Sequence, residues 1–156
     1  MGNEAGTGGP SGPLPLCIGI TGHRDLRPGD EPRLRQQLTQ QLQHCLAQAQ
    51  HTPLHVLSAL AEGADLLAAE VALALADAGH PVLLRAVLPL PWADYAADFA
   101  PEVRARVQAV LERVAKPHRI EPDRETLLAR LGLPAGSMRI DGEARITCYE
   151  DVGRRI

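Results

Sequence analysis

Residues 14–21, which read Leu-Pro-Leu-Cys-Ile-Gly-Ile-Thr, form a short and nearly continuous apolar run. A run of this length without alternating polar residues is typical of a strand buried on both faces, and such strands occur mainly in parallel sheets. Two similar runs follow at residues 54–60 and 82–90. Because each pair of runs is separated by a segment long enough for a crossover helix, we predict an α/β domain with a mainly parallel sheet.

The segments between the apolar runs have helical patterns. The first has leucines along one stripe and glutamines on the opposite face, which predicts a surface helix. The second, residues 65–78, has almost no polar face and should be heavily buried, with Gly79 ending it. Right-handed crossovers then place the strands in the order 3-2-1, in a Rossmann-like three-layer sandwich. Arg85, the charged residue of the third run, should reach solvent from the sheet edge.

The chain after the third strand is harder to assign. An amphipathic pattern predicts a helix over residues 95–114, which Pro101 kinks near its start. A short helix is expected at residues 127–131, closed by Gly132. Residues 138–146 alternate in polarity, a pattern compatible with a small hairpin or with a loop.

Length and composition favour a single cytoplasmic domain. The 156 residues suffice for one core, and the Gly- and Pro-rich residues 1–14 are predicted to be a disordered leader before one domain at 15–156. No apolar run approaches the roughly 18 residues that a membrane span needs. The three cysteines form no CxxC pair, which fits a reducing compartment, and the histidines show no metal-ligand spacing. The net charge of −3 makes nucleic acid an unlikely partner.

The first loop of interest directly follows the first predicted strand and reads Thr21-Gly22-His23-Arg24-Asp25. The carboxyl ends of parallel strands form the ligand crevice of open α/β sheets. There Gly22 allows a backbone to approach a phosphate, Thr21 offers a hydroxyl, and Arg24 can bind phosphate oxygens. The alternative is a tight turn with solvated His23 and Arg24 side chains.

The second loop joins the second strand to the buried helix and reads Ser-Ala-Leu-Ala-Glu-Gly-Ala-Asp at residues 58–65. The free amides and the positive dipole end of a helix favour an anion at this place, and Gly63 keeps the approach open. Glu62 and Asp65 can accept ribose hydroxyls, although for Asp65 a helix-capping role is the simpler prediction. Neither loop is a GxGxxG or Walker motif, so the residues alone predict only a crevice suited to phosphate.

Three stretches in combination are similar to a known superfamily. They are Cys-Ile-Gly-Ile-Thr-Gly-His-Arg-Asp-Leu at 17–26, Leu-Ser-Ala-Leu-Ala-Glu-Gly-Ala-Asp at 57–65, and Ala-Val-Leu-Pro-Leu-Pro at 86–91, followed by Tyr95 and Asp98-Phe99. In this order they resemble the SLOG superfamily, which includes Lonely Guy phosphoribohydrolases, the DNA-processing protein A family, and ligand-sensing domains of TRPM channels and bacterial defence systems.

The resemblance implies a Rossmann-like domain that binds a nucleotide or a nucleotide-derived signal. The glycine turn of the superfamily falls on Gly22, with Thr21, His23 and Arg24 beside it. Its second phosphate-binding turn falls on the following residues: Ser58, Glu62, Gly63 and Asp65. The resemblance implies no metal and no cofactor beyond a nucleotide-type ligand, and paired subunits common in this superfamily predict a homo-oligomer.

Two departures from the superfamily pattern qualify this expectation. Its phosphoribohydrolases carry a Pro-Gly-Gly-x-Gly-Thr-x-x-Glu motif that supplies a catalytic glutamate, and the motif is missing here. In sensor-type members a helix containing Val-Gly-Arg leads into another strand, and residues 149–156 resemble that helix. The resemblance therefore predicts a domain truncated at its C-terminus, without the strands beyond the first one. We expect residues 16–20 to be covered by the segment after Lys116, by a second copy, or by further strands.

Four functions remain open at this point. The leading hypothesis is a sensor-type module that binds a nucleotide signal and has no catalytic residues. The alternatives are a nucleoside monophosphate phosphoribohydrolase whose missing acid comes from a second chain, a single-strand DNA-binding module like DNA-processing protein A, and a remnant with no activity. The missing glutamate motif separates sensor from enzyme, and the acidic net charge separates sensor from DNA binder.

Overall fold

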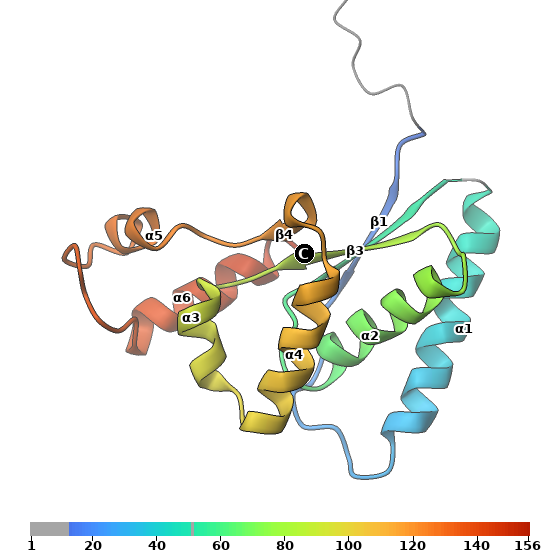
Figure 1. Cartoon of the computed structure of the whole chain (residues 1–156), viewed down its shortest axis with the longest axis horizontal. Coiled ribbons are helices and arrows are strands. Elements are labelled where there is room, and N and C mark those ends of the chain that lie inside the picture. The colour runs from blue at the N-terminus through green and yellow to red at the C-terminus, as the bar shows by residue number, and fades with distance from the viewer. Residues whose placement is uncertain (1–12, 51) are drawn as a thin grey trace, which may run out of the picture.

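The computed structural model describes residues 13–50 and 52–156, so the predicted leader lies almost wholly outside the described residues. Its elements alternate between strands and helices along the first two thirds of the chain (Figure 1). In chain order they are β1 (Leu16–Ile20), α1 (Glu31–Ala49), β2 (Leu54–Ser58), α2 (Ala64–Asp77), β3 (Val82–Val87), α3 (Trp92–Tyr95), η1 (Ala96–Asp98), α4 (Pro101–Arg113), η2 (Lys116–His118), β4 (Arg119–Ile120), α5 (Arg124–Arg130) and α6 (Gly142–Gly153).

The predicted α/β class with a parallel sheet is confirmed. The described sheet has four parallel strands in the order β1-β2-β3-β4, where the sequence predicted 3-2-1. Within it Ile18 pairs with Val56, and Val56 pairs with Leu84. The difference is β4, which pairs with β3 and extends the sheet past it. The sequence pattern missed β4 because a strand of two residues leaves no apolar run.

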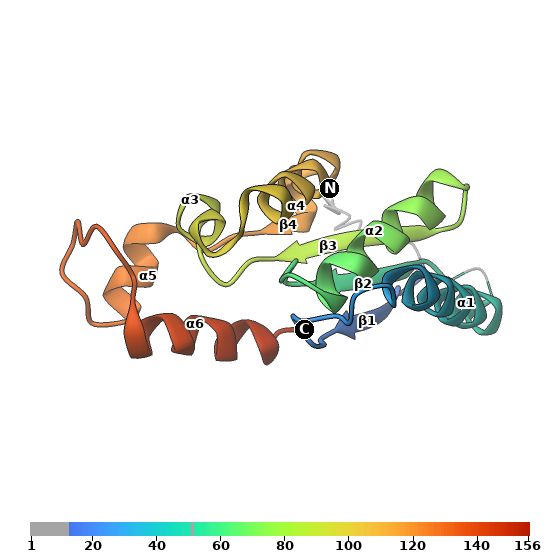
Figure 2. The ribbon, with the colours of Figure 1, turned by 90° about the horizontal axis from the view of Figure 1, so that it is seen from below.

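Helices lie on both sides of the sheet. α2 packs between α1 and α4 and contacts β2 and β3, and its buried leucines and alanines fill the main core. On the opposite face, Val152 of α6 packs with Ala59 and Val87, and Ile156 lies beside them. Both views show α5 and α6 beyond the end toward which the strands run (Figures 1 and 2). The arrangement agrees with an α/β sandwich, with α1, α2 and α4 on one face of the sheet and the end of α6 on the other.

The helix predicted over residues 95–114 is wrong as a single element. The structure breaks it into α3, the short 3-10 helix η1 and α4, with Phe99 and Ala100 extended between the last two. Proline has no backbone N–H, so it fits the first turn of a helix better than its interior. Pro101 therefore starts α4 and does not kink a longer helix.

Two further predictions are corrected, and one is confirmed. Residues 138–146 were predicted to form a small hairpin or a loop, and this is wrong for the second half of the segment, because α6 begins at Gly142. Arg85 is partly exposed but its Nε atom is buried, and β3 is not the edge strand of the sheet, because β4 pairs with it at Ala86 and Val87. The short helix near residue 127 is present as α5.

The edge strand β1 pairs only with β2 within the described sheet. Ile156 packs against the face of β1 on the side of α6, because a side chain at Gly19 would collide with the Ile156 backbone. Leu16 at the start of the strand is 40% exposed. In the described parts of the chain, no helix has the length and apolar character to cross a membrane.

Candidate functional site

The loops after β1 and β2 meet at the carboxyl edge of the sheet, as predicted from their places after neighbouring strands. The backbone N–H of Ala64 donates to the carbonyl oxygen of His23 over 3.1 Å. A Cβ atom at Gly22 would lie 2.5 Å from the Cβ of Ala64. The two loops are therefore in direct contact, and side chains on one are within reach of those on the other.

Gly63 makes this contact possible. Its backbone has φ 90° and ψ −126°, a conformation that residues with a side chain rarely adopt. A Cβ atom there would collide with the carbonyl oxygens of His23 and Arg24 and would lie 2.7 Å from the Arg24 carbonyl carbon. The sequence predicted an open approach at Gly63, and the structure shows that the glycine also admits the first loop.

The buried side chain of Ser58 stabilises the conformation of the second loop. Its side chain is fully buried, and its hydroxyl donates to the carbonyl oxygen of Asp65 over 2.9 Å. The same hydroxyl accepts the backbone N–H of Leu60 over 3.1 Å, where φ is 58°. With both of these bonds made inside the turn, the hydroxyl of Ser58 shapes the loop and does not face a cavity.

Asp65 is the buried carboxylate of the site. It is the second residue of α2, whose N-cap is Gly63, and no side chain caps this helix, so the predicted capping role is wrong. The side chain is 7% exposed, and burial raises its pKa from 3.8 to about 6. A hydrogen bond from the backbone of Gly22 opposes part of this shift. Asp65 therefore ties the start of α2 to the first loop.

Two cavities lie against the start of α2. The first, which we call the outer cavity, has a volume of about 230 Å³. It is lined by Arg24, Asp25, Leu26, Glu31, Glu62, Gly63, Leu66, Leu67, Val103 and Arg106. The second, the inner cavity, has a volume of about 160 Å³. It is lined by Ile20, Thr21, Gly22, Ala59, Ala61, Asp65, Tyr95, Tyr149, Val152, Gly153 and Ile156.

The predicted site residues are divided between these cavities. Arg24, Glu62 and Gly63 line the outer one. Thr21, Gly22 and Asp65 line the inner one. His23 is exposed and lines neither, so its contribution is the backbone carbonyl that Ala64 contacts. A larger cavity of about 400 Å³, bounded by Asp94, Asp98, Arg139 and Arg145, contains no predicted site residue.

The outer cavity combines charges of both signs with free backbone donors. Its lining includes two arginines and three carboxylate residues, namely Arg24, Arg106, Asp25, Glu31 and Glu62. Within the described chain the backbone N–H groups of Glu62 and Gly63, just before α2, make no hydrogen bond. Free amides and the helix dipole favour an anion here, while the carboxylates suit hydroxyl donors. This arrangement fits a ligand that carries both a phosphate and hydroxyl groups.

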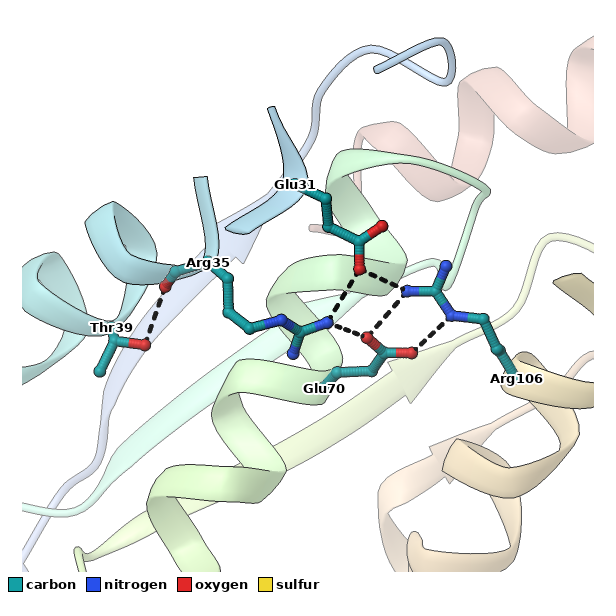
Figure 3. Close-up of polar contacts among 5 residues, drawn as sticks. All are labelled: Glu31, Arg35, Thr39, Glu70 and Arg106. Atoms are coloured by element: carbon teal, nitrogen blue, oxygen red, sulfur yellow. Dashed lines mark hydrogen bonds and ion pairs between the residues drawn. The ribbon is translucent and has the colours of Figure 1, made fainter. Parts of the chain in front are cut away.

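A four-residue ion network borders the outer cavity and was missed by sequence reasoning (Figure 3). Glu70 of α2 accepts Arg35 of α1 at 2.6 Å and both Nε and Nη2 of Arg106 of α4 at 2.9 Å. Glu31 accepts the same two arginines at 3.1 and 3.3 Å. Burial raises the pKa of Glu70, but the hydrogen bonds from Arg106 and Arg35 outweigh it and hold the pKa below its usual value. Glu31 and Arg35 are an i,i+4 pair on α1, but Glu70 and Arg106 come from other helices, so no local motif indicates the network as a whole.

The inner cavity has an aromatic wall. Tyr95 is 2% exposed and packs edge-on against Phe99, and burial raises the pKa of its hydroxyl well above the usual range. Tyr149 of α6 donates to Asp98, which also accepts Arg145. These contacts hold α6 against η1. The Tyr95 ring packs against Phe99 and forms part of the cavity wall.

Comparisons with known proteins identified no relative of this chain. No protein-family model matches the sequence, and a search of curated proteins found no similar sequence. Among the described residues, no group of three or more His, Cys, Asp or Glu side chains could hold a metal ion. The site therefore has to be interpreted from its own geometry and from the sequence resemblance.

Proposed function

We propose that the crevice at the carboxyl edge of the sheet binds a phosphorylated nucleotide or a nucleotide-derived signal, and that the protein is a sensor-type binding module. One observation carries the proposal. The loops after β1 and β2 meet and place Arg24 and the unpaired amides before α2 around a single cavity, which Arg106 of α4 also lines. The resemblance of these same loops to the SLOG superfamily supports it independently.

The chemistry of the outer cavity supports a division of roles. The guanidinium of Arg24 makes no side-chain hydrogen bond or ion pair within the described residues, so it is available for phosphate oxygens. The amides of Glu62 and Gly63 add donors on the positive side of the α2 dipole. The carboxylate of Glu62 accepts ribose hydroxyls in this arrangement. Phosphate and sugar of one ligand are then bound by adjacent groups.

Cavity size favours a small ligand. The outer and inner cavities, at about 230 and 160 Å³, are each below the roughly 300–1,000 Å³ of typical ligand sites. Such a space suits a mononucleotide or its phosphoribosyl part better than a dinucleotide. The catalytic glutamate motif of the phosphoribohydrolases is missing from the sequence, so we expect binding without release of the base.

Titration calorimetry with a panel of mono-, di-, tri- and cyclic nucleotides tests the proposal. Losing one charge-assisted contact costs roughly 1.5–3 kcal/mol, so Arg24→Ala should weaken binding by about tenfold or more. Arg27→Ala is the matched control, because Arg27 is exposed, lies three residues away and lines neither cavity. Binding by no member of the panel, or equal losses in the two variants, would refute the proposal. Chromatography of the same mixtures should detect no free base.

We extend the proposal to the state of the chain in solution. Cys17, Cys45 and Cys148 are all free thiols, which fits a reducing cytoplasm. The partly exposed edge of β1 supports a homo-oligomer in which a second copy covers residues 16–20. A solution mass measurement with hydrogen exchange on these residues tests this. A monomer with fast exchange there would count against it.

A further inference from the structure

Arg106 lies between the ion network and the outer cavity. On one side Glu70 binds it through two parallel hydrogen bonds of 2.9 Å, to Nε and Nη2. On the other side Glu31, itself a cavity-lining residue, contacts Nη2 at 3.3 Å, the longest contact in the network. Figure 3 shows the remaining nitrogen of Arg106 without a partner among the residues drawn. The paired bonds from Glu70 fix the plane of the guanidinium and leave its cavity side able to bind an anion.

We propose that Arg106 binds the phosphate group of the ligand, and that Glu31 is the carboxylate this phosphate displaces. The inference rests on the proposed function of the outer cavity and adds two residues to it. Arg106 would be a ligand-binding residue on α4, opposite Arg24. Glu31 would be a competitor within the chain, since its carboxylate offers the same acceptor oxygens as a phosphate.

Burial explains why Glu31 is displaced and Glu70 stays. The Glu31 side chain is 43% exposed and that of Glu70 only 21%. Removing the partner of a more buried carboxylate is the more expensive change. Glu31 also keeps its contact with Arg35 at 3.1 Å when it leaves Arg106, so it is not left unpaired. The exchange therefore costs the protein little and frees the cavity side of the Arg106 guanidinium for the ligand, while Glu70 stays paired with the same guanidinium.

The proposal connects the cavity to the position of α1. Glu31 is the first residue of α1, and its bond to Arg106 joins the start of α1 to α4. When a phosphate takes its place, this contact is lost while Glu70 still holds Arg35 and Arg106. We expect ligand binding to loosen the first turn of α1 and the loop before it. Faster hydrogen exchange at residues 27–35 on ligand addition would report this directly.

The decisive experiment compares variants on the two sides of the same ion pair. Inorganic phosphate and the tightest-binding nucleotide are titrated into the wild type, Arg106→Ala, Arg106→Lys and Glu31→Gln. Arg106→Ala should weaken binding by about tenfold or more, and Arg106→Lys should recover part of the loss. Glu31→Gln should tighten binding several-fold, because it removes the competing charge. Arg113→Ala is the matched control on α4, since its partner Asp77 lies away from the cavity.

Opposite effects of Glu31→Gln and Arg106→Ala separate this role from a structural one. A pair that only holds α1 and α4 together would lose affinity in both variants or in neither, and that result overturns the inference. Unfolding curves establish that each variant folds; if Arg106→Ala does not, Arg106→Lys and Glu31→Gln decide the question.

The two proposals can fail separately. If nucleotides bind and depend on Arg24 but not on Arg106, the proposed function holds and this inference is refuted. Nuclear magnetic resonance of the arginine Nε–H signals adds a test that needs no nucleotide. A shift of the Arg106 signal with inorganic phosphate, larger in Glu31→Gln, would support the inference even if no nucleotide binds. No shift with any probe would overturn it.

Discussion

Replacing Gly63 by alanine tests whether the contact between the two loops is as tight as the structure shows. With φ at 90° and ψ at −126°, alanine would be strained, because residues with a side chain rarely adopt this backbone conformation, at a cost of roughly 1–3 kcal/mol. Its Cβ would also collide with the carbonyl oxygens of His23 and Arg24, which are backbone atoms and cannot rotate away. The first loop must then move, and the hydrogen bond from Ala64 to His23 is lost.

The magnitude follows from these two effects. A backbone hydrogen bond contributes about 0.5–1.5 kcal/mol net, so Gly63→Ala should lower the free energy of unfolding by roughly 1.5–4.5 kcal/mol in total. Gly79 is the matched control, because its φ is 86° but no atom lies within 4 Å of a Cβ built there. Gly79→Ala therefore carries only the backbone strain, roughly 1–2 kcal/mol.

Urea unfolding followed by circular dichroism measures both variants against the wild type. For a chain of this length each kcal/mol lowers the melting temperature by about 2–4 °C, so thermal melts should give the same ranking. If Gly63→Ala lost no more stability than Gly79→Ala, the collision would be absent in solution. The two loops would then not be in contact, and the crevice would have to be abandoned.

Three further predictions concern the polar groups of the site. Burial raises the pKa of Asp65 from 3.8 to about 6, so the folded protein binds more protons than the unfolded chain between these values and wild-type stability falls as the pH rises through them. The free energy of unfolding of Asp65→Asn should not fall in this way, so relative to the wild type it should rise by up to about 3 kcal/mol between pH 4 and 7, as measured by urea titrations. A difference between the two proteins that does not change with pH would contradict the raised pKa. Glu70→Gln should lower the free energy of unfolding by about 1–2 kcal/mol, whereas Asp77→Asn, which breaks an exposed pair with Arg113, should lower it by about 0.5 kcal/mol or less. Equal effects of the two substitutions in denaturant melts would show that the network stabilises the fold no more than an exposed ion pair does. Ser58→Ala leaves the buried N–H of Leu60 unpaired and should cost roughly 1–3 kcal/mol, against little change for the exposed hydroxyl of Ser137 in Ser137→Ala, and thermal melts should separate the two variants.

Local patterns in the sequence were enough for the class of fold and for the position of the crevice. The apolar runs at residues 16–20, 54–58 and 82–87 became parallel strands, as predicted. Burial on both faces was wrong for residues 16–20, because β1 lies at the sheet edge and contains no buried residue. The near absence of polar residues in 65–77 indicated a buried helix. The contact between the loops after β1 and β2 then followed from the tendency of sequential strands to be neighbours, since neighbouring parallel strands end at the same edge of the sheet.

Features that depend on atoms far apart in the chain were decided only by the tertiary structure. The strand β4 consists of two residues whose pairing with β3 carries no signal in their own side chains. Asp65 looked like a helix cap in sequence, yet burial and the approach of Gly22 give its carboxylate a different role. The sequence by itself determined which segments bury apolar side chains and where the chain turns. The meeting of Glu31, Glu70 and Arg106 depends on how three helices pack, because the energy of an ion pair depends on distance and burial in space and not on separation along the chain.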